Sequence, residues 1–115
     1  MRMWMVNPKI LCRQHLLGEH LECHTFVGTL KKGNSIKGYL QNNLLEPKSL
    51  IIRHNQLANE ILNRGYNHHS PMEEQESEYL DHLSKEELNT KIDVSKSLAE
   101  LLSRCERCYR LSQNA

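Results

Sequence analysis

The chain of 115 residues has a net charge of +1, with 38% hydrophobic and 25% charged residues. These are ordinary values for a globular protein, and the length predicts one domain, residues 1–115, with one core. No apolar run approaches the roughly 20 residues that cross a bilayer. The first residues, MRMWMVNPK, are too short and too interrupted for a signal peptide. We therefore expect a cytoplasmic protein with no membrane partner.

Positive charge is concentrated in the first part of the chain. Residues 1–70 hold nine Lys and Arg against four Asp and Glu, whereas residues 71–115 hold six against ten. The first part could face a polyanion, with the acidic part as its solvated back. Chance asymmetry in a small protein explains the split equally well. We expect a helical core over residues 1–70 and an acidic helical part over residues 71–115.

The first 34 residues predict one long helix after a short apolar segment. MRMWMV is apolar and β-prone, and Asn7-Pro8 is typical of a helix N-cap followed by Pro. A helical period then runs from Leu11 and should end near Lys31-Lys32-Gly33, where cations precede a Gly. The positions in this period are Leu11, Leu16, Leu17, Leu21, Cys23, Phe26, Val27 and Leu30.

Two or three further helices are predicted downstream. One should run from about Pro47 to Asn63 with Leu50, Ile51, Leu57, Ile61 and Leu62 facing inward, and residues 66–77 look like a loop. Ser84 and Glu87 have the spacing of a capping box. A last helix, capped by Asp93 or Ser95, should reach about Cys108 with Val94, Leu98, Leu101 and Leu102 inward. With almost no strand signal, we predict a compact all-α protein.

The stretch QHLLGEHLECH, residues 14–24, concentrates titratable groups on a predicted helix. Helical spacing places His15, Glu19 and Glu22 on one face, and turns His20 and His24 away from it. A surface helix with solvated side chains is one interpretation. A metal site at His20 and His24 is a second, although Leu21 stands where a zincin needs Glu. Acid/base chemistry on a substrate is the third.

Several short motifs in order resemble a known enzyme family. They are Gln14-His15-Leu16, a Glu seven residues after that His, then FVG-x-x-KKG, and later RHNQLANEILNRGYN. This order and spacing resembles the phage pyrimidine-dimer DNA glycosylases, also called endonuclease V, over about residues 1–70. The resemblance implies a compact all-α enzyme that acts on double-stranded DNA with a damaged, modified or abasic site, as a monomer encoded by a bacterium or a phage.

The resemblance also implies the catalytic groups. In that family the nucleophile is the N-terminal α-amine, assisted by a Glu on the first long helix. That carboxylate falls on Glu22, and the family's mature N-terminal residue falls on Met1. The family exposes a Thr after losing its initiator Met, but the large Arg2 here should keep Met1 in place. Met1 would then supply the amine. Because the amine needs no particular side chain, this replacement is chemically tolerable.

DNA contacts are expected from basic and polar residues of the first 70. The candidates are Arg2, Arg13, Gln14, His15, His24, Lys31, Lys32, Lys37, His68 and His69, with a solvated surface charge as the ordinary alternative for each Lys. The two Arg that flank the family's catalytic Glu fall on Leu21 and Thr25, and its helix-kinking Pro falls on His24. Only Tyr109 and Arg110 resemble its basic, aromatic tail. These departures put a pyrimidine dimer in question as the substrate.

Cys105-x-x-Cys108 is half of a zinc motif, which Cys12, Cys23 or a His of the first helix would have to complete. Reduced thiols packed on a helix are the preferred interpretation, so we expect no cofactor. The sequence thus predicts a DNA glycosylase with AP-lyase activity on damaged or modified pyrimidines. The alternative is a non-catalytic DNA-binding or partner-binding module that retains the glycosylase fold.

Overall fold

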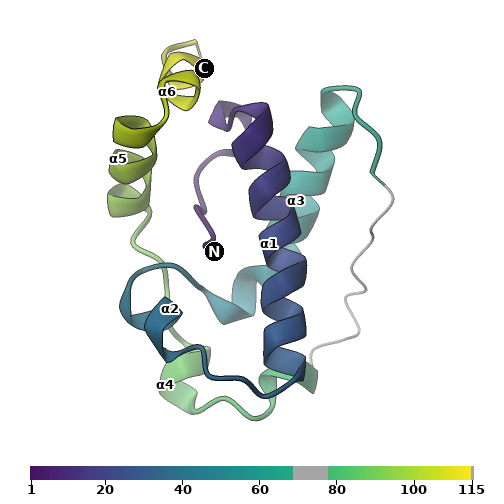
Figure 1. The fold of residues 1–115 in the computed structure, drawn as a ribbon, viewed down its shortest axis with the longest axis vertical. Helices are drawn as coiled ribbons and strands as arrows, with labels where there is room; N and C mark the ends of the chain where they lie inside the picture. The colour runs from purple at the N-terminus through teal and green to yellow at the C-terminus, as the bar shows by residue number, and fades with distance from the viewer. Residues whose placement is uncertain (69–77, 115) are drawn as a thin grey trace.

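The structure is a computed structural model that describes residues 1–68 and 78–114. Within these ranges it is all helical, as predicted, with no strand. Six α-helices follow one another along the described chain (Figure 1): α1 (Arg13–Lys31), α2 (Lys37–Gln41), α3 (Leu50–Asn63), α4 (Lys85–Leu88), α5 (Val94–Arg104) and α6 (Glu106–Gln113). Three 3-10 turns accompany them in the described residues: Pro8–Ile10 before α1, Pro47–Ser49 before α3 and Glu78–Leu80 before α4. None of the described helices is long and apolar enough to cross a membrane.

The core lies where α1 packs against α3. The predicted helical period of α1 buries Leu16, Cys23, Phe26 and Leu30, which recur every three to seven residues on one face. From α3, apolar side chains reach the same core at Leu50, Leu57 and Ile61. The long N-terminal helix and the helix ending at Asn63 therefore confirm the periodicity except at Leu21, which is 65% exposed because it lies on the opposite face of α1 from Leu16 and Cys23.

The first six residues run as an extended segment beside α1 rather than as a strand (Figure 1). Their apolar side chains explain the location, because Met3, Trp4 and Val6 are all buried. The Met3 backbone N–H donates to the Leu44 carbonyl at 2.8 Å. The apolar side chains of MRMWMV thus pack against helices. The segment forms no strand, because the described chain has no other strand to pair with it.

Three further details of the predicted helices were wrong. The last helix does not continue to Cys108, because Cys105 adopts an extended backbone (φ −124°, ψ 106°) and separates α5 from α6. Val94 and Leu62 were expected to face inward but are 44% and 55% exposed. Val94 shares a face with Leu98 and Leu101 but is the first residue of α5, whereas Leu62 lies outside the buried face formed by Leu50, Leu57 and Ile61 of α3. The capping box at Ser84 and Glu87 and the Asp93 N-cap are confirmed.

The C-terminal helices pack onto the start of the chain. Ser97 of α5 donates a hydrogen bond to the Trp4 carbonyl at 2.5 Å. The Cys12 backbone N–H, at the beginning of α1, lies 3.2 Å from the Cys108 sulfur of α6. Figure 1 shows the chain start lying between α1 and α5. The acidic C-terminal part therefore holds the N-terminal segment against α1.

Candidate active site

A pocket of about 260 Å³ opens on the first half of α1. Its lining residues are Trp4, Gln14, His15, Gly18, Glu19 and Glu22. The face predicted from helical spacing is therefore confirmed, because His15, Glu19 and Glu22 all line one pocket. Gly18 lies between the first two, where the absence of a side chain leaves the pocket open. The N-terminal segment adds Trp4, which sequence reasoning did not select.

Glu22 meets the start of the chain. The Arg2 backbone N–H donates to the Glu22 carboxylate Oε2 at 3.0 Å. One residue of chain adds at most roughly 4 Å between successive backbone nitrogens, so the Met1 amine lies within roughly 7 Å of this oxygen. Met1 is 41% exposed. Glu22 therefore lies near Met1, the two residues that the resemblance singles out.

Arg2 fixes the N-terminal segment through its side chain. Its Nη1 donates to Glu100 at 2.6 Å, its Nη2 to Ser97 at 3.2 Å, and its guanidinium lies 3.7 Å from the centre of the Trp4 ring. The hydrogen bond from Arg2 lowers the pKa of the Glu100 carboxyl. Arg2 was predicted to contact DNA phosphate. In the structure Arg2 is only 8% exposed and its guanidinium binds groups of the protein instead.

Beneath the pocket, Glu19 is part of a buried ion pair. Arg53 of α3 donates to both of its carboxylate oxygens, at 2.6 and 2.9 Å, and also to the Val6 carbonyl at 2.7 Å. The Met5 backbone, in the left-handed region at φ 60°, directs its N–H toward Glu19 at 3.5 Å. A bidentate charged pair of this kind is rigid and specific. Glu19 thus supports the fold and, with Arg53, contacts the N-terminal segment at Met5 and Val6.

His20 lies in a histidine cluster on the opposite side of α1. Its Nε2 lies 3.0 Å from His54 Nε2 and 2.8 Å from His68 Nε2. The His24 ring packs against those of His20 and His54, with centroids 5.1 and 4.7 Å apart. Burial, and then the neighbouring His54, His68 and His24, lower the pKa of His20 to about 4. Three nitrogens this close could also take a metal ion, through His20, His54 and His68 rather than His20 and His24.

The other predicted DNA contacts are spread along the molecule. Arg13 is exposed at the start of α1, with its guanidinium 5.2 Å from the Tyr66 ring centre. Lys31 and Lys32 are exposed at the other end of the helix, roughly 27 Å away at 1.5 Å per residue. Lys37 is exposed at the first position of α2. These cations could follow a nucleic-acid backbone but do not form one compact patch.

Three further predicted contacts have different surroundings. Gln14 is exposed on the pocket wall. His24 and His68 belong to the histidine cluster, which leaves their rings partly buried. His69 lies outside the described residues. Leu21 and Thr25, which replace the family's two Arg, are both exposed, so the outer face of α1 near Glu22 is uncharged at these positions.

His15 has a second set of neighbours besides the pocket. Its Nδ1 lies 3.2 Å from the Cys12 sulfur and 3.7 Å from the Cys108 sulfur. Its ring also meets the Trp4 ring edge-on, with centroids 5.8 Å apart. His15, which was predicted to contact DNA, therefore lies between the pocket and the sulfurs of Cys12 and Cys108.

One of three comparisons with known proteins found a match for this chain. A family model described as pyrimidine dimer DNA glycosylase matches residues 1–74, well over half of the chain. No curated protein and no solved structure matches it. The matched segment contains the whole pocket, including Trp4 and Glu22. It ends before α4, α5 and α6.

Proposed function

Because this chain belongs to the pyrimidine dimer DNA glycosylase family, we propose that it is a DNA glycosylase with AP-lyase activity on damaged or modified pyrimidines. Its nucleophile is the Met1 α-amine, and Glu22 is its catalytic carboxylate. The observation that carries the proposal is the hydrogen bond from the Arg2 backbone N–H to Glu22 at 3.0 Å. That bond holds the residue next to the amine against Glu22, which, unlike the other pocket-lining carboxylate, is not engaged by Arg53.

The chemistry needs an amine that is partly unprotonated near neutral pH. α-Amines have reference pKa values of about 7.7–8.0, against about 10.4 for lysine. An N-terminal amine therefore serves as a nucleophile without the burial that a lysine would need. The exposed Met1 has room to approach a sugar placed at the pocket mouth.

In the proposed reaction, the amine nitrogen forms a bond to deoxyribose C1′ while the glycosidic bond breaks, and the proton that the amine then loses is taken up by the departing base. Opening of the sugar ring at C1′–O4′, with a proton from water added to O4′, then produces a protonated Schiff base. Loss of a proton from C2′ expels the 3′ phosphate and cuts the strand. Glu22 stabilises the cationic sugar and receives the C2′ proton.

Access to a nucleotide inside a duplex requires extrusion of that nucleotide, at a cost of a few kcal/mol. Contacts to phosphates offset this cost. Arg13, Lys31, Lys32 and Lys37 are exposed cations in the first part of the chain that could supply such contacts. Since Leu21 and Thr25 replace two Arg beside Glu22, the proposed substrate is a modified pyrimidine or an abasic site, without commitment to a pyrimidine dimer.

The test is borohydride trapping on a duplex with one abasic site, using protein without an N-terminal tag whose intact mass establishes that it begins at Met1. Borohydride reduces the Schiff base to a stable amine, and peptide mapping locates it. We expect the adduct on the Met1 amine. A two-residue N-terminal extension should reduce trapping more than 100-fold, whereas the same extension after Ala115 should not.

Two outcomes would contradict the proposal. An adduct on an internal Lys would retain the lyase class but overturn the role of Met1. No adduct, together with salt-dependent binding to the same duplex, would identify a DNA-binding module that keeps the glycosylase fold.

A further inference from the structure

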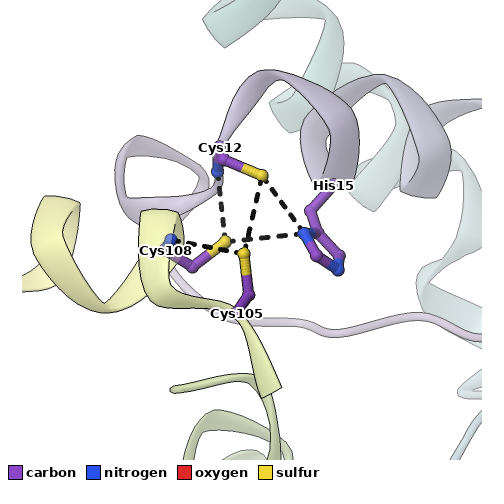
Figure 2. Close-up of side chains that lie close together, drawn as sticks. All are labelled: Cys12, His15, Cys105 and Cys108. Carbon is purple, nitrogen blue, oxygen red and sulfur yellow. Dashed lines mark hydrogen bonds between the residues drawn. The ribbon is translucent and has the colours of Figure 1, made fainter. Parts of the chain in front are cut away.

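Four metal-ligating side chains converge from the two ends of the chain (Figure 2). Cys12 is the N-cap residue of α1, and His15 lies in the first turn of that helix. Cys105 is the N-cap residue of α6, and Cys108 lies in its first turn. One sulfur or ring nitrogen from each residue lies within 4.8 Å of all the others. Two Cys-x-x-His/Cys pairs thus face each other across the contact between α1 and α6.

The distances between these ligand atoms fit a tetrahedrally coordinated metal ion. Zinc binds Cys sulfur at about 2.3 Å and His nitrogen at about 2.0–2.1 Å, which gives tetrahedral edges of about 3.8 Å between sulfurs and about 3.6 Å between sulfur and nitrogen. The Cys12 and Cys105 sulfurs are 3.8 Å apart. His15 Nδ1 lies 3.2 Å from the Cys12 sulfur and 3.7 Å from that of Cys108.

Two backbone N–H groups are directed at sulfurs of the cluster. The Cys12 backbone N–H points at the Cys108 sulfur at 3.2 Å, and the Cys108 N–H points at the Cys105 sulfur at 3.5 Å. Such N–H contacts and the positive ends of two helices stabilise the negative charge that metal-bound sulfur carries. All four cysteines are free. A disulfide would use two of the three sulfurs and leave His15 without a role.

We propose that Cys12, His15, Cys105 and Cys108 form a structural zinc site. Four protein ligands close the coordination sphere and leave no open position for a substrate, which is typical of structural zinc. Cys12 and Cys108 are buried, at 4% and 0% exposure, so the site lies inside the contact between helices. Cys12 and His15 are thereby assigned as the ligands that complete the zinc motif of Cys105-x-x-Cys108. The sequence alone had left Cys12, Cys23 or a His of the first helix as candidates.

The ion would join the C-terminal helices to the pocket. It ties α6 to the first turn of α1, and α5, directly before α6, supplies Ser97 to the Trp4 carbonyl and Glu100 to Arg2. The N-terminal segment that ends at the pocket is therefore held by helices that the ion anchors. As a ligand, His15 contributes a fixed wall to the pocket and its Nδ1 is not available to DNA.

The first experiment measures metal in the full chain, prepared without a His tag and reconstituted with zinc under reducing conditions. We expect about one zinc per chain. Substitution with Co²⁺ should produce the intense thiolate-to-cobalt charge-transfer bands and the strong visible bands of tetrahedral coordination. The thiolate bands distinguish cobalt bound at the cysteines from cobalt bound at the histidine cluster, because His20, His54 and His68 offer no sulfur.

The matched variants are Cys108→Ala and Cys23→Ala, since both residues are 0% exposed but only Cys108 belongs to the cluster. Cys23→Ala should keep one zinc per chain and the cobalt bands. Cys108→Ala, and the partly exposed Cys105→Ser, should lose at least 90% of the bound zinc and the bands. A chelator should then lower the melting temperature of wild type and of Cys23→Ala only.

Absence of the thiolate bands from wild-type protein would overturn the zinc site, whatever the variants do. Zinc that is retained equally by Cys105→Ser and wild type would also overturn it and would move the ion to the histidines. The site stands independently of the proposed strand cleavage, because metal content and the cobalt spectrum are measured without DNA.

Discussion

Two carboxylates three residues apart on α1 have different surroundings. Glu19 is 1% exposed and both of its oxygens accept hydrogen bonds from Arg53. Glu22, one turn further along, is half-buried at the pocket and accepts a hydrogen bond from the backbone of Arg2. Both line the same pocket. The difference teaches that helical spacing selects the candidates, whereas the partners from other segments decide which carboxylate is structural and which one meets the substrate.

The sharpest test of this contrast is Glu22→Gln. The amide keeps the size of the side chain but cannot accept a proton, so strand cleavage at an abasic site should fall about 10²–10⁴-fold. The melting temperature should stay within about 2 °C, since the amide oxygen of Gln can still accept the hydrogen bond from the Arg2 backbone N–H. Single-turnover cleavage and thermal unfolding measure the two effects.

Exposed Glu86→Gln is the matched control for Glu22→Gln and should cleave like wild type. Cleavage by Glu22→Gln at the wild-type rate would contradict the catalytic role of Glu22.

The structural role of Glu19 is tested by Arg53→Met, which leaves the Glu19 carboxylate buried without its partner. We expect a loss of about 3–5 kcal/mol in the free energy of unfolding, because an uncompensated buried charge is costly. Urea denaturation measures it. Replacing Glu19 as well, by Met, should recover much of the loss, since two apolar side chains carry no buried charge.

Arg110→Met is the matched control for Arg53→Met. Arg110 pairs with Glu106 on the surface, where the two side chains are 72% and 75% exposed. Such a pair contributes at most about 1 kcal/mol. Equal losses in the two variants would show that the buried Glu19–Arg53 pair supports the fold no more than a surface pair does.

The histidine cluster behind the two carboxylates provides a test by pH. Because the pKa of His20 falls from 6.5 to about 4 in the folded protein, the unfolded chain binds more protons between these values. Stability should therefore be full above pH 6.5 and should decline as the pH falls toward 4. Since part of His20 stays in water, which screens its charge, we expect a loss on the order of 1 kcal/mol.

Urea denaturation across this pH range, with a chelator present throughout, measures the decline. His20→Asn should flatten it, whereas His82→Asn, a change at a His outside the cluster, should leave it unchanged. An identical slope in His20→Asn and wild type would contradict the assignment of the decline to His20.

The smallest expected effect is that of the cations far from both carboxylates. The double change Lys31→Gln and Lys32→Gln should weaken DNA binding several-fold and reduce the slope of log K against log salt by about 1 for each phosphate that is no longer neutralised. The rate of cleavage at saturating protein should not change. Binding titrations at several salt concentrations measure the slope. An unchanged slope would show that Lys31 and Lys32 do not touch DNA.

Much of the local structure could be predicted, and the site only in part. The helical period predicted α1 and α3, and the Ser84–Glu87 capping box predicted the start of α4. The same spacing placed His15, Glu19 and Glu22 on one face. Leu62 and Val94 were wrongly expected to be buried, because periodicity gives the direction of an apolar stripe but neither its edges nor how far along the helix it is covered. Arg2 was assigned to DNA by its charge alone.

The features that could be read from the sequence depend on neighbours a few residues apart: the helices, their caps and the face that carries Glu22. Which residues pair across the chain became known only from the packed helices. Glu19 and Arg53 are 34 residues apart, and Cys12 and Cys105 are 93 apart. The physical reason is that helix period and caps come from short-range hydrogen bonds and sterics, which a local pattern records. Pairing across the chain depends on how the packed helices bring distant residues into contact.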